Sequence, residues 1–169
     1  MLMEIRKAIP SDLVEILYLL RVCVKDMNEK GMKQWNSAHP EAKVIIRNLE
    51  EGYIYLLKDK GVCKGMVTLT PEVPVDHKDL NLSGDNRKVL YIQWMAVHPN
   101  WQGRGIARML LDFAENHARK NKFDMIQVDV FSEHDLAHQI CQKKEFTEAG
   151  KFHSSFQKIP FICYEKVIK

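Results

Sequence analysis

Apolar residues recur along the chain with two periods, and the longer period marks the predicted helices. In Ser11–Met27 the apolar positions return every three or four residues, which predicts an amphipathic helix. The same spacing predicts a short helix after Pro40, a long helix over Arg104–Lys120, and a further short helix capped by Ser132. The predicted helices are therefore spread over the length of the chain.

Runs rich in β-branched, aromatic and other apolar residues predict strands. In chain order they are Met3–Ala8, Tyr53–Leu57, Val62–Leu69, Val89–Val97, Asp124–Val130, Phe146–Gly150 and Phe161–Ile168. The cluster Lys-Asp-Lys-Gly at 58–61 predicts a turn, and hence an antiparallel hairpin between the second and third runs. Pro71–Lys88 has two prolines and no periodicity, so we predict a long loop there.

The segment 89–130 has the order strand, glycine turn, helix, strand, which is typical of a right-handed βαβ unit. Its two strands are therefore expected to be parallel neighbours. Together with the predicted hairpin, this unit indicates a mixed α/β protein.

Length and composition limit the class of protein. The chain has 169 residues, 46% of them hydrophobic and 28% charged, which suits one globular domain of roughly 150 residues. We predict a single domain over residues 1–169. The net charge of +3 is too small for a dedicated nucleic-acid binder. Between Gln102 and Lys122, five basic residues stand against two acidic ones, which favours an anionic ligand in that segment.

The cysteines and the N-terminus indicate a protein of a reducing compartment. Cys23, Cys63, Cys141 and Cys163 lie far apart and form no C-x-x-C pair. Charged residues interrupt any apolar run at the N-terminus, and no apolar stretch approaches the roughly 20 residues that span a bilayer. We expect a cytoplasmic protein with free thiols and no membrane partner.

The glycine turn between strand 89–97 and the following helix is the clearest candidate for chemistry. Two glycines in Gln102–Ala107 allow backbone N–H groups to approach a phosphate, and Arg104 and Arg108 add positive charge at the start of the helix. A P-loop is excluded because no lysine follows Gly105. A Rossmann fingerprint lacks its third glycine. The structural alternative is that these glycines only make a tight turn.

The residues around this turn resemble the GNAT superfamily of N-acetyltransferases. The resemblance is carried by Trp94–Pro99, Gln102–Ala107 and Leu110–Leu111. The family signature is Q/R-x-x-G-x-G/A, and its fixed places are occupied by Gln102, Gly105 and Ala107. The resemblance implies a single domain with a mixed, mostly antiparallel twisted sheet, a parallel βαβ unit and flanking helices.

The same resemblance implies acetyl-coenzyme A (acetyl-CoA) as donor and direct attack by an amine on its thioester. The pyrophosphate is then expected on the N–H groups of Gln102, Gly103, Arg104, Gly105, Ile106 and Ala107. The pantetheine arm is expected along Met95, Ala96 and Val97, with the Val97 N–H as donor to the oxyanion. The acceptor is a primary amine of a small molecule or peptide, and its identity stays open.

The helix after strand 124–130 departs from the family pattern N-x-x-A-x-x-L-Y-x-K-x-G-F. His134 stands at the cofactor-contacting Asn place, and Cys141 stands at the place of the Tyr that protonates the departing thiolate. Cys141 is our candidate for that general acid, with core packing as its alternative. No base is assigned, because Glu41, Glu72 and Asp76 are better explained as solvated surface charges.

Two further features have functional and structural alternatives. His134 and His138 imitate the H-E-x-x-H zinc motif with Asp135 in place of Glu, but no third ligand is identifiable, so we assign no metal site. Trp35 lies in the Gly31–Pro40 connection, which walls the acceptor site in the superfamily. Its alternative role is as an aromatic packing anchor. We expect this connection and the loop Pro71–Lys88 to select the acceptor.

The leading hypothesis is an acetyl-CoA-dependent N-acetyltransferase, present as a monomer or homodimer and binding no nucleic acid. A non-catalytic acyl-CoA-binding or regulatory module is the main alternative, because the family's tyrosine is missing. A nucleotide-binding domain that uses the glycine turn for another phosphate is the third possibility.

Overall fold

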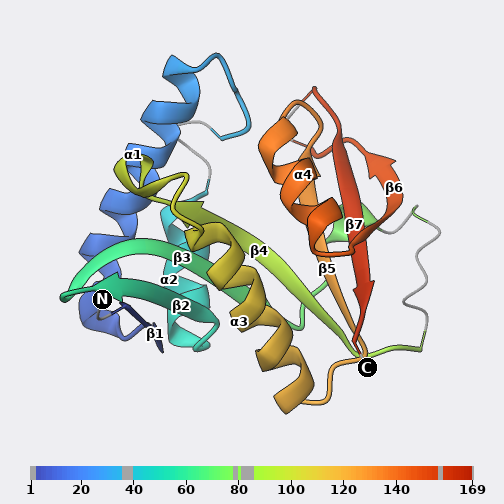
Figure 1. Cartoon of the computed structure of the whole chain (residues 1–169), viewed down its shortest axis with the longest axis horizontal. Coiled ribbons are helices and arrows are strands. Elements are labelled where there is room, and N and C mark those ends of the chain that lie inside the picture. The colour runs from blue at the N-terminus through green and yellow to red at the C-terminus, as the bar shows by residue number, and fades with distance from the viewer. Residues whose placement is uncertain (1–2, 36–39, 78–79, 81–85, 156–157, 169) are drawn as a thin grey trace. The chain divides into compact units, whose positions relative to one another are not determined.

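The computed structural model describes residues 3–35, 40–77, 80, 86–155 and 158–168 (Figure 1). Its strands are β1 (Met3–Lys7), β2 (Ile54–Asp59), β3 (Val62–Thr70), β4 (Val89–Val97), β5 (Met125–Phe131), β6 (Thr147–Phe152) and β7 (Phe161–Val167). Its α-helices are α1 (Leu13–Glu29), α2 (Ala42–Glu50), α3 (Ile106–Lys120) and α4 (Asp135–Lys143). Short 3₁₀ helices are η1 (Pro10–Asp12), η2 (Val75–His77) and η3 (Pro99–Trp101).

The strands form one mixed sheet in the order β1-β2-β3-β4-β5-β7-β6. β4 and β5 run parallel, with Val89 opposite Met125, as predicted for the βαβ unit. The pairs β1–β2, β2–β3, β5–β7 and β6–β7 are antiparallel. The predicted mixed α/β class, with its hairpin and mostly antiparallel sheet, is confirmed.

The chain clusters into two compact units. The first unit is Met1–Leu69 with Trp94–Phe113, and the second is Thr70–Gln93 with Ala114–Lys169. Each unit has its own buried residues, for example Ile16, Ile45 and Met66 in the first and Met125, Phe131 and Tyr164 in the second. The single domain over residues 1–169 stays a prediction.

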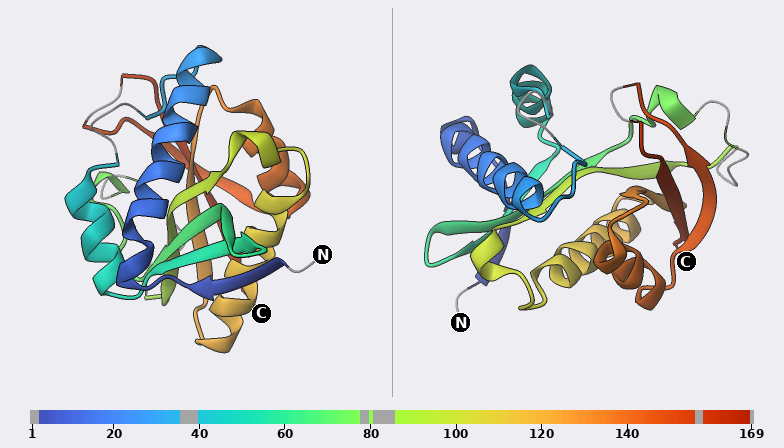
Figure 2. Two further views of the ribbon diagram at one scale, coloured as in Figure 1. Left: turned by 90° about the vertical axis from the view of Figure 1, so that its left-hand side faces the viewer. Right: turned by 90° about the horizontal axis from the view of Figure 1, so that it is seen from above.

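In the first unit, α1 and α2 lie on one face of β2 and β3, and the start of α3 lies on the other (Figure 2). The helical period explains this position, because Ile16, Leu19 and Cys23 are buried while Val14 and Tyr18 are exposed. The buried face of α1 packs with residues of α2, β2 and β3 into one hydrophobic cluster.

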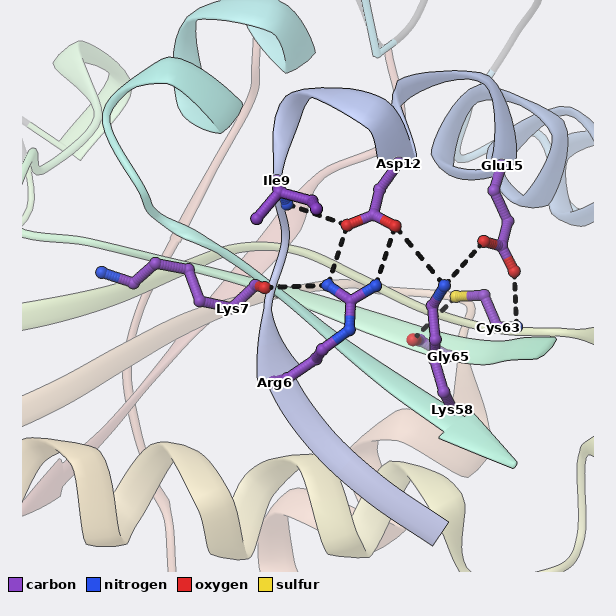
Figure 3. Close-up of polar contacts among 8 residues, drawn as sticks. All are labelled: Arg6, Lys7, Ile9, Asp12, Glu15, Lys58, Cys63 and Gly65. Atoms are coloured by element: carbon purple, nitrogen blue, oxygen red, sulfur yellow. Dashed lines mark hydrogen bonds and ion pairs between the residues drawn. The ribbon is translucent and has the colours of Figure 1, made fainter. Parts of the chain in front are cut away.

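A partly buried ion network fixes the start of α1 to β1 and β2 (Figure 3). Asp12 accepts two hydrogen bonds of 2.9 Å from the Arg6 guanidinium and one of 2.8 Å from the Ile9 N–H. Lys58 Nζ lies 2.9 Å from Glu15 and 3.4 Å from Asp12. The hydrogen bonds from Arg6 hold the pKa of the Asp12 carboxyl well below its usual range.

Several element boundaries differ from the sequence prediction, and two of the differences have a clear local cause. The hairpin turn is only Lys60 and Gly61, both with positive φ, so β2 continues through Asp59. The predicted Ser132 cap of α4 is wrong. The helix begins at Asp135, and the Nδ1 atom of His134 accepts the cap bond from the Ala137 N–H at 3.3 Å. Ser132 belongs instead to the turn after β5, where its N–H donates to the Pro160 carbonyl.

Candidate cofactor and active site

The glycine turn connects η3 to α3 in the first unit. Gly103 and Gly105 have φ of +75° and +79°, a region that disfavours side chains. A Cβ added at either glycine meets no atom within 4 Å, so glycine is required here by conformation and not by crowding. The Met109 N–H donates to the Gly105 carbonyl at 3.0 Å. The N–H groups that precede Met109 in the first helical turn therefore have no acceptor within the helix.

The turn is held to the end of β4 by its own glutamine. Gln102 Nε2 donates to the Val97 carbonyl at 3.3 Å, and Cys23 Sγ lies 3.4 Å from the same oxygen. His98, which follows Val97 in the chain, donates its N–H to the Lys64 carbonyl of β3 at 2.8 Å. Gln102 is thus a positioning residue for the turn, in addition to its place in the motif.

Positive charge surrounds the turn. The Arg104 guanidinium lies 4.6 Å, and Lys64 Nζ lies 4.3 Å, from the centre of the Trp101 ring. Lys30 Nζ lies 3.4 Å from Gln102 Oε1. N–H groups at a helix start with cations beside them favour an anion. That this turn binds one stays a prediction.

Gly65 on β3 lies against the end of β4 and the start of α3, and the sequence analysis did not single it out. A Cβ at Gly65 would lie 3.2 Å from the Ala96 carbonyl and 3.0 Å from the Ile106 side chain. Its hydrogen atom therefore allows β3 to pack closely beneath the end of β4 and the start of α3. The available signal was a glycine inside a strand, which often marks close backbone approach.

The predicted catalytic residue Cys141 lies in α4, in the second unit, and its side chain is buried. Burial raises the pKa of its thiol to about 12. His134, the other predicted residue of this helix, caps the helix through Nδ1. That these two residues share a site with the glycine turn stays a prediction.

The histidines of the zinc-like motif have other partners. His138 Nδ1 lies 2.8 Å from the Tyr164 hydroxyl, and its Nε2 lies 3.1 Å from the carbonyl oxygens of Phe131 and Ser132. His134 caps α4, and His138 connects α4 to Tyr164 of β7, so both histidines have structural partners.

Trp35 is part of the buried core of the first unit. It is 6% exposed, and its ring packs edge-on against Trp94 with 5.6 Å between ring centroids. This favours the packing role over the acceptor wall for this residue. Positions 36–39 of the same connection lie outside the described residues, as do 78–79 and 81–85 of the second predicted acceptor segment.

The segment predicted as a long loop contains a residue that the sequence did not single out. His77, in η2, is 4% exposed, and its Nε2 lies 2.8 Å from both carboxylate oxygens of Asp129 on β5. The Tyr91 hydroxyl of β4 donates to Asp129 Oδ2. Burial and the Asp129 charge raise the pKa of Tyr91 well above its usual value. No local pattern reveals this cluster, because its members are far apart in the sequence.

The acetyltransferase (GNAT) family model matches residues 19–146. The chain belongs to this family, as its motif predicted. No curated protein matches the chain in sequence.

Solved structures show the same fold. A GNAT-family acetyltransferase from Streptococcus agalactiae superposes with a TM-score of 0.83 at 19% identity, over 99% of this chain and 96% of that one. A GNAT-family acetyltransferase from Listeria monocytogenes has a TM-score of 0.80 at 20% identity, over 98% and 94%. The yncA protein of Salmonella typhimurium, solved with its cofactor acetyl-CoA, has a TM-score of 0.74 at 17% identity, over 99% and 94%.

Among the described residues, no helix combines the length and the apolar character needed to cross a membrane.

Proposed function

We propose that this protein is an acetyl-CoA-dependent N-acetyltransferase that moves an acetyl group to the primary amine of a small molecule or peptide. The observation that carries the proposal is the glycine turn, with two left-handed glycines and a helix start beside Arg104, in a chain of the GNAT family. The acetyl-CoA in the Salmonella typhimurium neighbour supports the choice of donor. We further propose a cytoplasmic location.

The turn would hold the pyrophosphate through the N–H groups of Gln102, Gly103, Arg104, Gly105, Ile106 and Ala107. The pantetheine arm would lie along Met95, Ala96 and Val97, where Gln102 already fixes the Val97 carbonyl. His134 takes the remaining cofactor contact in the proposal. The open space around both turn glycines is consistent with a ligand that approaches the backbone directly.

In the proposed reaction the neutral amine nitrogen attacks the thioester carbonyl, forming the C–N bond and breaking the C–S bond. The extra proton on the nitrogen passes to water. The Val97 N–H stabilises the oxyanion, and loss of a donor of this type costs about 3–4 kcal/mol of barrier. Cys141 protonates the departing thiolate. Its raised pKa of about 12 keeps the thiol protonated at physiological pH but also makes it a weak acid.

A non-catalytic acyl-CoA-binding module is the second candidate, because Cys141 stands where the family pattern has tyrosine. One experiment separates the two. Thiol release from acetyl-CoA is followed with amino acids, polyamines, aminoglycosides, peptides with free N-termini and lysine peptides. The proposal expects at least one amine to release coenzyme A well above the amine-free rate. Binding of acetyl-CoA without acceleration by any amine would favour the module instead, and binding of NAD in place of acetyl-CoA would contradict both.

A further inference from the structure

Three side chains with metal-binding atoms converge inside the second unit, apart from the residues that the proposed function uses. They come from different elements: His77 from η2, Asp129 from β5 and Cys163 from β7. One ligand atom from each lies within 4.8 Å of the others. His77 and Cys163 are 4% and 0% exposed, and the Asp129 side chain is 9% exposed. The arrangement is therefore a converged donor set and not a surface cluster.

The backbone fixes these positions. Asp129 and Cys163 are direct cross-strand partners in the antiparallel β5–β7 pair, so their side chains lie on the same face of the sheet. His77 reaches the same point from η2, and its ring packs against Tyr91 and Phe152 at centroid distances of 5.5 and 5.1 Å. A donor set held in this way by strands and packed rings is preorganised.

We propose that His77, Asp129 and Cys163 form a binding site for one zinc-class divalent cation. Imidazole nitrogen, carboxylate oxygen and thiolate sulfur are the ligands that Zn²⁺ takes in proteins. With bond lengths of about 2.0–2.3 Å, the donors around a tetrahedral zinc lie roughly 3.3–3.6 Å apart. The three donor atoms all lie within 4.8 Å of one another. The 2.8 Å between His77 Nε2 and Asp129 is shorter than the zinc spacing, so a bound ion would move these two side chains apart by about 0.5 Å.

Charge supports the same conclusion. A buried carboxylate is costly unless a cation accompanies it. A divalent ion bound by the Asp129 carboxylate, the Cys163 thiolate and a neutral His77 gives a site of zero net charge. Binding displaces the thiol proton to solvent and uses the lone pair of the imidazole, so no oxidant or further reactant is required.

Tyr91 completes the site as a positioning residue. Its hydroxyl donates to Oδ2 of Asp129 and so orients the carboxylate, whose two oxygens both lie 2.8 Å from His77 Nε2. Hydrogen bonds of this kind to a ligating carboxylate are the usual support of a metal centre. The fourth position around the ion is left for water or for the second carboxylate oxygen.

The test uses the full chain, stripped with a chelator and then loaded with Zn²⁺ or Co²⁺. We expect one equivalent of zinc after desalting, and a near-ultraviolet thiolate-to-cobalt band. Cys163→Ser should abolish the band, because the thiolate is lost. Both Cys163→Ser and Asp129→Asn should weaken zinc binding at least about 100-fold. Cys63→Ser, which removes a buried thiol of the first unit, should leave both unchanged.

The metal-binding experiment does not depend on acetyl transfer, and each of its outcomes supports or overturns the zinc-site proposal. Wild-type protein that binds no zinc, or binds cobalt without the thiolate band, overturns the proposal even if a variant fails to fold. Folded Cys163→Ser and Asp129→Asn variants with wild-type zinc affinity place the metal elsewhere and overturn it too.

Discussion

Cys141 carries the least usual chemistry of the proposed site, because a buried thiol stands where the family pattern has tyrosine. Burial raises its pKa to about 12, so the proton is present at every physiological pH. A proton donor to the coenzyme A thiolate must be protonated before the C–S bond breaks and acidic enough to give the proton up. Cys141 meets the first condition, and its raised pKa works against the second.

Cys141→Ala should lower turnover about 100-fold with little change in the KM for acetyl-CoA, since the lost interaction belongs to the transition state. Steady-state thiol release with the best amine of the panel measures both parameters. Cys63→Ala is the matched control, because it also removes a buried thiol. Equal turnover in wild type and Cys141→Ala would remove this residue from the mechanism and leave it a packing role.

At the scale of elements, the start of α1 depends on charged groups that are largely removed from water. The Asp12 side chain is 7% exposed, and its partner Arg6 is 34% exposed. Because the pKa of folded Asp12 is lowered, its ion pairs stabilise the fold fully above the unfolded pKa of about 3.9. That contribution is lost as the pH falls toward the lower, folded pKa.

Asp12→Asn should reduce the free energy of unfolding by about 2–3 kcal/mol at pH 7, less than for a fully buried pair because Arg6 is partly exposed. The difference in unfolding free energy between the variant and wild type should narrow as the pH falls below about 4. There the Asp12 carboxylate of the wild type takes up a proton on unfolding, which lowers the stability of the wild type. Urea unfolding at several pH values measures both effects.

Glu29→Gln is the control, because it removes only an exposed pair with Lys25, and it should change stability by less than about 0.5 kcal/mol. A gap between Asp12→Asn and wild type that stays constant from neutral to acid pH would contradict the assignment of the ion network.

The elements themselves were largely predictable from sequence. β4 has the predicted bounds, Val89–Val97, because a long apolar run ends at a histidine and a proline. α3 begins two residues after the predicted Arg104, since the left-handed Gly105 precedes the first helical residue. The cap of α4 was missed, because histidine is an uncommon cap and Ser132 matched the usual pattern.

At the scale of the whole molecule, the sequence identified the groups that are local in the chain and missed those that only folding brings together. The glycine turn, Gln102 and the parallel βαβ unit follow from one continuous segment. The contact of His77 with Asp129 joins residues 52 positions apart, and neither belongs to a periodic pattern. Trp35 could not be placed by sequence, because a large aromatic suits both a core and a binding wall.

The central claim is that the glycine turn binds the acyl-CoA phosphates, and titration calorimetry with acetyl-CoA tests it most directly. Gly105→Glu puts a side chain and a negative charge where the phosphates are expected. Gly61→Glu is the matched control, since Gly61 has the same φ of +79° and equally open surroundings in the β2–β3 turn. Both variants bear the same backbone strain of about 1–2 kcal/mol.

The account predicts one acetyl-CoA per chain for wild type and for Gly61→Glu, with affinities that agree within about threefold, a difference of less than 0.7 kcal/mol. It predicts no measurable binding for Gly105→Glu, with circular dichroism showing the variant folded. A folded Gly105→Glu protein that binds acetyl-CoA with wild-type affinity would contradict the assignment of the cofactor site.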